Sequence, residues 1–304
     1  MSTCATASRN LSEPLAGTAA TAPTWLLIEQ PGPWGVKALT ASRLDPAVGR
    51  ALEAAAGDSG VRVALIRRPG RHADYGPDAE HRVFAAHTLP GRSWVRTALV
   101  TDPAELLGLD FAALGAGRHG GFGAAHEGAP LALVCTNGKR DRCCALRGRP
   151  LAAELVAGGE STWEVTHIGG HRFSPTLFVL PYGYAYGHAT AHGVKEILHA
   201  ARDGRIVTAG ARGRSAWDRP AQAADLAVRE HTGESGADAL SVPHTADRAG
   251  GWTVSVRHTD GRDWLVDIAR GASEPPRPES CGAVPVSPLR LDVTAVREAT
   301  ATTS

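Results

Sequence analysis

One order of predicted secondary structure occurs twice in this chain: strand, helix, three strands, helix. The strands of the first copy are predicted at 25–29, 61–67, 82–88 and 94–100, and its helices at 45–56 and 102–114. The second copy has predicted strands at 131–135, 162–167, 176–181 and 184–188, and predicted helices at 150–157 and 192–202. At 304 residues, the chain is long enough for two or three domains. The repeat therefore predicts an α/β fold with two tandem domains of one type, at 20–114 and 131–214.

The segments outside the two copies predict smaller units. Residues 115–130 are interpreted as a glycine-rich linker, because Gly115, Gly117 and Gly120 match GxGxxG but no helix follows to bind a phosphate. Residues 215–304 are predicted to form a small C-terminal α+β module. It contains a helix near 218–231, a hairpin of 252–258 and 263–269, and an irregular tail. The first 17 residues are interpreted as a polar leader.

Charge and hydropathy argue against several classes of partner. The 32 basic and 31 acidic residues leave a formal net charge of +1, which creates no large field toward nucleic acid or an anionic membrane. The N-terminus lacks an apolar signal core, and no apolar run approaches the roughly 18 residues needed to span a bilayer. We therefore expect a cytoplasmic protein with no nucleic-acid or membrane partner. In that reducing compartment, the five cysteines are expected to be ligands or free thiols.

Two cysteines and two histidines in the second copy have metal-ligand spacings. Eight residues lie between Cys135 and Cys144, and three lie between His167 and His171. Two thiolates and two imidazoles can close four coordination positions around one zinc ion or around two irons, and the spacing does not choose between these metals. The pattern is not that of a Rieske centre, in which each loop carries one Cys and one His.

Either Cys143 or Cys144 could supply the second thiolate ligand. Cys143 adjoins Cys144 on one polar loop, so we expect only one of them to face Cys135, and we favour Cys144. The other two cysteines, Cys4 and Cys281, are interpreted as incidental thiols.

The histidine pair also has a rival. His188 and His192 repeat the three-residue spacing of His167 and His171. Gly169-Gly170 allows a tight turn around a ligand between His167 and His171, whereas the rival pair straddles a predicted strand end without such a loop. We therefore favour His167 and His171 and interpret the rival pair as solvated surface.

The motif residues resemble those of the sucrase/ferredoxin-like family. The resemblance is carried by Cys-Thr-Asn-Gly-Lys-Arg-Asp-Arg-Cys-Cys at 135–144, His-Ile-Gly-Gly-His at 167–171 and Tyr-Gly at 186–187. It extends to Gly-Thr-Ala at 17–19, the segment 25–34 and Ser-Cys-Gly at 280–282. One departure is Asn137, where histidine is expected in many relatives.

This resemblance implies that the two tandem domains are thioredoxin-like and that the second is similar to a thioredoxin-like ferredoxin. Only the second is expected to hold a metal, because the first has Gln-Pro-Gly-Pro at 30–33 where the second has Cys135. The implied cofactor is a [2Fe-2S] cluster with Cys135, Cys144, His167 and His171 as its ligands. Imidazoles in place of two thiolates are expected to raise the reduction potential above that of plant-type ferredoxins. Each imidazole also keeps a second ring nitrogen that can hold a proton, so reduction is expected to be coupled to proton uptake.

The expected activity is electron transfer between a redox donor protein and an acceptor protein. Lys139, Arg140 and Arg142 lie beside the motif and are interpreted as a docking face for an acidic partner. One alternative is a structural zinc site with the same four ligands in a thioredoxin-like binding module. Another is a thiol oxidoreductase that uses Cys143 and Cys144, although the chain has no CxxC motif. No hydrolase is expected, because no acidic pair accompanies the site and no GxSxG motif is present.

Overall fold

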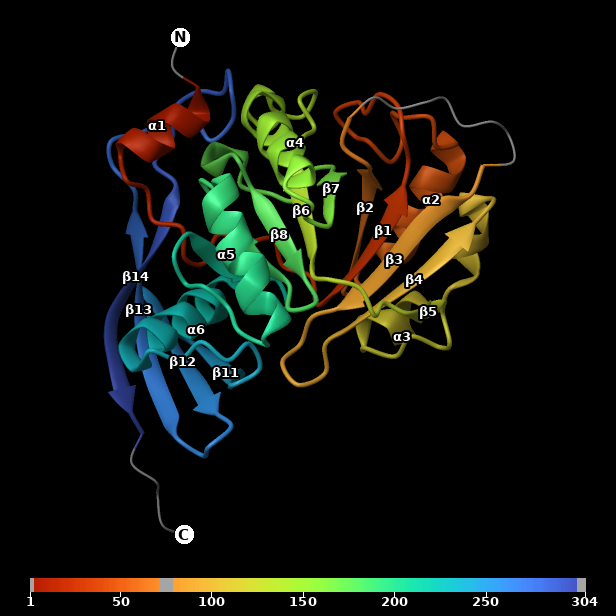
Figure 1. Cartoon of the computed structure of the whole chain (residues 1–304). Coiled ribbons are helices and arrows are strands. Elements are labelled where there is room, and N and C mark those ends of the chain that lie inside the picture. Colours follow the sequence, from red (N-terminus) through yellow and green to blue (C-terminus); the bar gives the residue numbers. More distant parts are fainter. Residues whose placement is uncertain (1–2, 71–78, 300–304) are drawn as a thin grey trace.

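The computed structural model describes residues 3–70 and 79–299, which form two β-sheets with helices packed around them (Figure 1). The larger sheet is mixed and ten-stranded, with the order β10-β9-β8-β6-β7-β2-β1-β3-β4-β5. The smaller, C-terminal sheet is antiparallel and has the order β11-β12-β13-β14. The predicted α/β class is therefore confirmed. Within the described ranges, no helix is long and apolar enough to cross a membrane.

The first half of the large sheet contains the strands predicted for the first copy. Its elements are β1 (Thr24–Glu29), α2 (Pro46–Ala56), β2 (Val61–Arg67), β3 (His81–His87), β4 (Trp94–Val100) and the edge strand β5 (Ala124–Ala125). The Asp45 side chain caps α2 by accepting a hydrogen bond from the backbone N–H of Ala47. The helix predicted at 102–114 is divided into the 3₁₀ helix η1 (Pro103–Gly108) and α3 (Phe111–Gly115), because Asp110 caps a second start.

The second half likewise contains the strands predicted for the second copy. Its elements are β6 (Leu131–Cys135), the π-helical turn η2 (Cys144–Gly148), α4 (Arg149–Ala157), β7 (Thr162–Val165), the 3₁₀ turn η3 (His171–Phe173), β8 (Leu177–Leu180), β9 (Tyr184–Tyr186), α5 (Ala191–Arg202) and β10 (Ala211–Arg214). Thr190 caps α5 by accepting a hydrogen bond from the backbone N–H of Gly193.

Both halves have the same strand pairing. In the first half, β1 pairs in parallel with β2 and antiparallel with β3, and β3 pairs antiparallel with β4. In the second half, β6, β7, β8 and β9 repeat these pairings in the same order. The halves meet where β2 pairs antiparallel with β7, with Ile66 opposite Val165 and Arg67 opposite Glu164. The two predicted units therefore share one continuous sheet.

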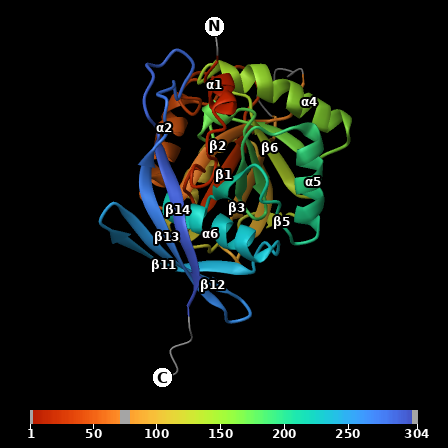
Figure 2. The ribbon, with the colours of Figure 1, turned by 90° about the vertical axis from the view of Figure 1, so that its left-hand side faces the viewer.

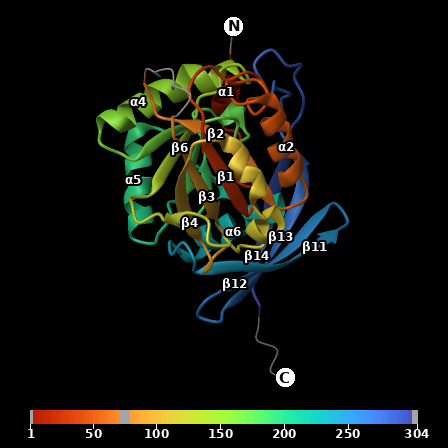
Figure 3. The same cartoon turned by 90° about the vertical axis from the view of Figure 1, so that its right-hand side faces the viewer.

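The large sheet curves, and one of its faces encloses a core that both halves share. Trp25 on β1 and Phe178 on β8 are four strand steps apart, about 19 Å in a flat sheet, yet their ring centroids are only 4.5 Å apart. Phe84 on β3 and Trp163 on β7 also meet, edge to face, at 5.6 Å. The opposite face packs on α2 in the first half (Figure 3) and on α4 and α5 in the second.

The C-terminal module contains the predicted hairpin and helix, but it has two further strands. The hairpin is β12 (Gly251–His258) and β13 (Asp263–Ala272), flanked by β11 (Leu240–Arg248) and β14 (Leu289–Glu298), and α6 (Arg219–Thr232) packs on this sheet. The prediction of an irregular tail is therefore wrong for β14. Leu289, Leu291 and Val293 alternate with polar residues, and Leu291 packs on the core of this sheet, so the sequence carried a strand pattern that the prediction missed. Pairing with β13 completes the strand.

The N-terminal leader is also more regular than predicted. Residues 4–10 form the helix α1 (Cys4–Asn10), which Thr3 caps. The segment between β13 and β14 extends to α1 and lies beside it, whereas β14 leads away from α1 toward the opposite end of the molecule (Figures 1 and 2). Glu13, just after α1, accepts a hydrogen bond from Arg277 of this segment at 3.0 Å.

Candidate metal centre

Cys135 and His167 lie at one edge of the sheet because β6 and β7 are parallel neighbours. β6 ends at Cys135, which is in register with Val165 of β7, and His167 follows two residues later. The carboxyl ends of parallel strands lie at the same sheet edge, so the loops after β6 and β7 emerge together. Gly148 lets η2 pack closely against the backbone of Cys135, because a Cβ atom on residue 148 would clash with the carbonyl oxygen of Cys135.

The side chains of Cys135 and Cys144 face each other in the enclosed core. The hydrogen bond from Cys144 holds the pKa of the Cys135 thiol well below its usual range despite burial, and His167 lowers this pKa further. The same bond and burial raise the pKa of Cys144. A pair of buried sulfur atoms, one of them ionised, is a donor set suited to a soft metal ion.

His167 and His171 also converge, and their ring centroids are 5.2 Å apart. Gly169 and Gly170 turn the chain between them with φ angles of +80° and +67°, as the sequence predicted. Nδ1 of each ring is buried and has no hydrogen-bond partner within the described residues. Burial lowers the pKa of His171, so its imidazole is neutral at pH 7. A neutral ring with a buried, unsatisfied nitrogen is a ready metal ligand.

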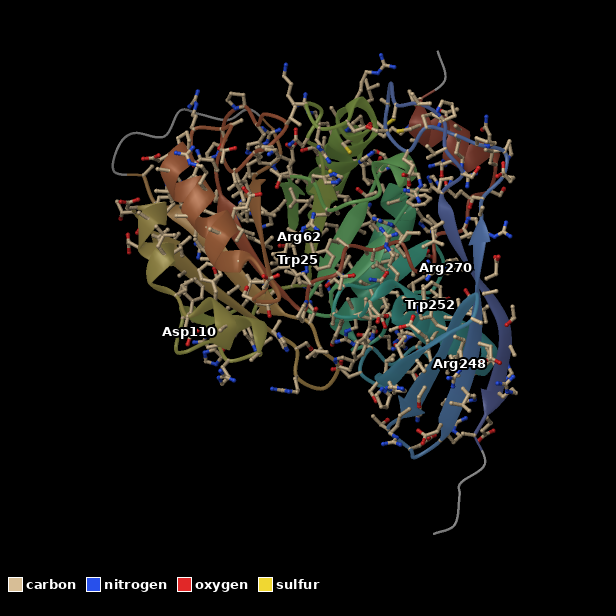
Figure 4. All side chains as sticks on the ribbon, turned by 180° about the vertical axis from the view of Figure 1, so that it is seen from behind. Trp25, Arg62, Asp110, Arg248, Trp252 and Arg270 are labelled. Carbon is tan, nitrogen blue, oxygen red and sulfur yellow. The ribbon has the colours of Figure 1, made fainter. Side chains whose placement is uncertain are left out.

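Two arginines that the sequence did not identify hold the histidine loop. Arg62 donates a hydrogen bond to the carbonyl oxygen of His167 at 3.0 Å and lies over the ring of Trp25 (Figure 4). Arg212 is fully buried and donates to the carbonyl oxygen of Gly169 at 3.1 Å. Burial lowers the pKa of Arg212 to about 9, so it remains charged at pH 7. Both arginines interact electrostatically with Cys135, and they therefore place positive charge beside the thiol pair.

A second group of candidate ligands adjoins the first and is more compact. We call Cys4, Asp141, Cys143 and Cys281 the Cys3Asp group. It is the only set of three or more His, Cys, Asp or Glu side chains in the described ranges whose ligand atoms all lie within 4.8 Å of one another. The four ligands that the sequence predicted, here called the Cys2His2 group, are therefore more widely spaced. The compact candidate metal site has three Cys and one Asp, and not the predicted two Cys and two His.

The sulfur atoms of the Cys3Asp group are in mutual contact. The Sγ atom of Cys143 lies 3.4 Å from that of Cys4 and 3.1 Å from that of Cys281, and the Sγ atoms of Cys4 and Cys281 are 3.5 Å apart. Hydrogen bonds from Cys4 and Cys281 lower the pKa of Cys143 to about 5. The pKa of Cys4 is raised, first by its bond to Cys143 and then by burial.

Asp141 belongs to the Cys3Asp group and also lies next to the Cys2His2 group. Its carboxylate accepts hydrogen bonds from the backbone N–H groups of Cys143 (2.8 Å) and Cys281 (2.7 Å) and from the hydroxyl of Ser280 (2.9 Å). Although burial raises the pKa of this carboxyl, the backbone hydrogen bonds outweigh burial and hold it below its usual range. Oδ2 of Asp141 is 3.8 Å from Nε2 of His171, which belongs to the Cys2His2 group.

The structure corrects the interpretation of Cys4 and Cys281 as incidental thiols and shows what Cys143 contacts. The side chains of Cys143 and Cys144 face different neighbours: Cys144 faces Cys135, while Cys143 faces Cys4 and Cys281. This arrangement also argues against a thiol oxidoreductase built on the adjacent pair. Cys4 and Cys281 are not isolated thiols. They lie near opposite ends of the chain, so no spacing in the sequence could show that they meet Cys143.

The rival histidine pair is only partly solvated. The side chain of His192 is 86% exposed, as predicted. In contrast, both ring nitrogens of His188 are buried without a hydrogen-bond partner in the described part of the chain, and burial lowers its pKa to about 4. The interpretation of His188 as solvated surface is therefore wrong. Its backbone φ of +53° carries the ring inward, against Phe173.

The predicted basic docking residues are exposed. Lys139, Arg140 and Arg142 lie on the surface of the loop between β6 and η2. Asn137, the departure from the family pattern, stabilises this loop: its Oδ1 accepts hydrogen bonds from the backbone N–H groups of Lys139 (3.2 Å) and Arg140 (3.3 Å), and its Nδ2 donates one to Gly35.

Comparison with known proteins identifies the family. The model of the sucrase/ferredoxin-like family matches residues 15–213, which is more than half of the chain. The matched segment contains the whole Cys2His2 group together with Asp141 and Cys143, whereas Cys4 and Cys281 lie outside it. No curated protein and no solved structure matches the chain significantly. On the evidence of the family match, the chain belongs to the sucrase/ferredoxin-like family.

Proposed function

We propose that this protein is an electron carrier in which Cys135, Cys144, His167 and His171 hold a [2Fe-2S] cluster. The observation that carries this proposal is the pair of buried Nδ1 atoms, on His167 and His171, that have no partner among the described residues. These rings lie at the same sheet edge as a buried thiol pair in which one sulfur ionises easily. The family match supports the same conclusion.

The spacing of the Cys2His2 group favours two irons over one zinc ion. Ligands of a single tetrahedral zinc lie within about 4 Å of one another, because each bond is only about 2.0–2.3 Å long. In the Cys2His2 group, whose four residues all lie in the described ranges, no three ligand atoms are all within 4.8 Å of one another. A two-iron cluster, which has separate ligand pairs at its two ends, needs this wider spacing. A structural zinc ion with the same four ligands is therefore the less suitable occupant.

The residues around the site would adjust its redox chemistry. A bound [2Fe-2S] cluster would accept and release one electron. The neutral imidazoles of His167 and His171 leave less negative charge at the site than two further thiolates would. The positive charges of Arg62 and Arg212 add to this effect, because they lie close enough to Cys135 to interact with it electrostatically. We therefore expect a midpoint potential above that of plant-type ferredoxins.

We also infer that each half of the large sheet is a thioredoxin-like unit. The support is the repeated order β2-β1-β3-β4 and β7-β6-β8-β9, with one parallel pair and two antiparallel pairs in each half. The first half has Gln30 after β1, where the second half has Cys135 at the end of β6, so only the second half supplies thiolate ligands.

The partner that we propose is an acidic redox protein that docks on Lys139, Arg140 and Arg142. These residues follow Cys135 in the same loop and are exposed. Two other basic residues near the site are already paired: Arg147 donates to Thr6, and Arg172 binds Glu13 and Glu279. The three exposed charges are therefore available to an incoming protein.

The test is the visible spectrum and the iron and acid-labile sulfide content of protein purified without oxygen. We expect a reddish protein with about two irons and two sulfides per chain. His167→Ala and His171→Ala should each lose the visible absorption or change its bands. His192→Ala is the matched control, because the His192 side chain is exposed and pairs with Glu196 on the surface of α5. A colourless wild-type protein, or an unchanged spectrum in both histidine variants, would contradict the proposal.

A further inference from the structure

We propose that the Cys3Asp group, formed by Cys4, Asp141, Cys143 and Cys281, is a second metal site, which binds one zinc ion and fastens α1 and the segment between β13 and β14 beside the proposed redox site. This site is separate from the proposed cluster, because it shares none of its ligands. Two of its four residues, Cys4 and Cys281, lie outside the segment that matches the family model.

The distances match a single ion. Around tetrahedral zinc with Zn–S bonds of about 2.3 Å, neighbouring donors lie about 3.8 Å apart. The three sulfur atoms are separated by 3.1, 3.4 and 3.5 Å, and Sγ of Cys4 lies 3.7 and 3.8 Å from the two carboxylate oxygens of Asp141. The sulfur atoms need to separate by about 0.3–0.7 Å to reach this geometry. An iron–sulfur cluster would not fit, because its own iron and sulfide atoms must lie between the donors.

The chemistry of the donors selects the ion. Three thiolates favour zinc, copper(I) or iron over magnesium or calcium, and zinc accepts a tetrahedral set of thiolates and one carboxylate. The carboxylate of Asp141 is already held by hydrogen bonds from Cys143, Ser280 and Cys281, as expected of a metal-ligating carboxylate with an ordered outer shell. Without a cation, three thiols would crowd against an ionised carboxylate in a buried space.

The position of the site gives the ion a structural role. Cys4 comes from α1, Asp141 and Cys143 from the loop that also carries Cys144, and Cys281 from the segment between β13 and β14. Hydrogen bonds to Asp141 and ion pairs of Glu13 and Glu279 already link parts of these segments. One ion would join α1 and the segment between β13 and β14 directly to the loop that positions Cys144, and a closed set of four protein ligands is typical of structural zinc.

The test is the zinc and iron content of full-length protein, prepared without a metal-affinity tag and passed over a chelating resin. We expect one zinc ion per chain in the wild type. Cys4→Ser and Cys281→Ser should each lose the zinc but keep the iron and the visible spectrum. The double variant His167→Ala/His171→Ala should show the reverse, with iron lost and zinc kept. Ser287→Ala is the matched control, since Ser287 lies in the same segment as Cys281 but its hydroxyl binds Glu274, and this variant should keep its zinc.

Several results would overturn the proposal. They are a wild type without zinc, zinc that survives in both cysteine variants, and iron that is lost from a folded Cys4→Ser protein. If the cysteine variants do not fold, X-ray absorption at the zinc edge of the wild type decides. A first shell of three sulfurs and one oxygen supports the Cys3Asp site, whereas a shell that contains imidazole nitrogen places the zinc in the Cys2His2 group. The proposed cluster is tested separately by the iron content, so the two proposals can fail independently.

Discussion

At the scale of single residues, Asp141 connects the two groups of candidate ligands. Its Oδ2 accepts hydrogen bonds from Ser280 and Cys281 and lies 3.8 Å from Nε2 of His171. The backbone hydrogen bonds keep this carboxyl ionised, because they hold its pKa below the usual range in spite of burial. A fixed negative charge beside an imidazole favours the protonated form of that imidazole. Asp141 is thus placed to influence how firmly His171 holds a proton.

The first residue-scale prediction concerns the pH dependence of the midpoint potential. An imidazole ligand should hold its second proton more firmly when the site is reduced and more negative, so the midpoint potential should fall as pH rises. The expected slope is about 59 mV per pH unit between the oxidised-state and reduced-state pKa values, for one electron and one proton. Redox titrations from about pH 6 to 10 measure this slope. A midpoint that stays flat over the whole range would rule out the coupling.

The second residue-scale prediction concerns Glu13, which joins the segment between β13 and β14 to the histidine loop. Its buried carboxylate binds Arg172 at 2.8 Å and Arg277 at 3.0 Å. Burial alone would raise the pKa of Glu13, but these arginines outweigh it, so the pKa lies below the usual value. A carboxyl with a depressed pKa stabilises the fold above its unfolded-state pKa of about 4.3, and this stability is lost as pH falls through the folded-state pKa.

We therefore expect Glu13→Gln to lower the free energy of unfolding by about 3 kcal/mol at pH 7. The difference from the wild type should shrink as the pH falls below about 4. Urea unfolding at several pH values measures both effects. Glu279→Gln is the control, because Glu279 binds the same Arg172 from a half-exposed position and should cost less than about 1 kcal/mol. Equal losses for the two variants at pH 7 would contradict this account.

At the scale of secondary structure elements, the junction of β2 and β7 decides how the two halves are joined. The antiparallel pairing of β2 with β7 is short and consists of two residue pairs, Ile66 with Val165 and Arg67 with Glu164. The buried carboxylate of Glu164 binds Arg67 and also accepts a hydrogen bond from Thr136 at 2.8 Å. Thr136 directly follows Cys135, so the junction also supports the start of the candidate metal site.

We expect Glu164→Gln to destabilise the protein by about 3–5 kcal/mol, because it leaves the buried Arg67 without its counter-charge. The control is Glu160→Gln, which breaks the more exposed pair with Arg202 and should cost about 1 kcal/mol or less. Denaturant midpoints of the two variants give the comparison. A loss in Glu164→Gln no larger than that of the control would show that the junction does not depend on this ion pair.

At the scale of the whole molecule, the chain is nearly neutral, with a net charge of +1, yet exposed basic residues gather beside the candidate site. Lys139, Arg140 and Arg142 are exposed on one loop beside Cys135 and Cys144. Salt screens interactions between exposed charges over about 8–10 Å at physiological ionic strength. Association with an acidic partner at this face should therefore be faster at low salt.

We predict that reduction by an acidic plant-type ferredoxin, used as a probe, slows by about tenfold when salt rises from about 20 to 200 mM. Arg140→Glu should slow the reaction at low salt and weaken its salt dependence. Arg248→Glu is the matched charge reversal, because Arg248 is exposed on β11 in the C-terminal sheet (Figure 4). Stopped-flow traces that do not vary with ionic strength would rule out docking on this face.

Local sequence patterns predicted the order and type of most elements of the large sheet and the cysteine and histidine loops that carry Cys135 and His167. Apolar runs, capping residues such as Asp45, and the Gly169-Gly170 turn act over a few residues, so they can be identified along the chain. Such patterns could not show which distant residues meet. Cys4 and Cys281 reach Cys143, Arg62 reaches the histidine loop, and β14 pairs with β13. These contacts depend on the curvature of the sheet and on how α1 and the segment between β13 and β14 pack against it, which no local pattern encodes.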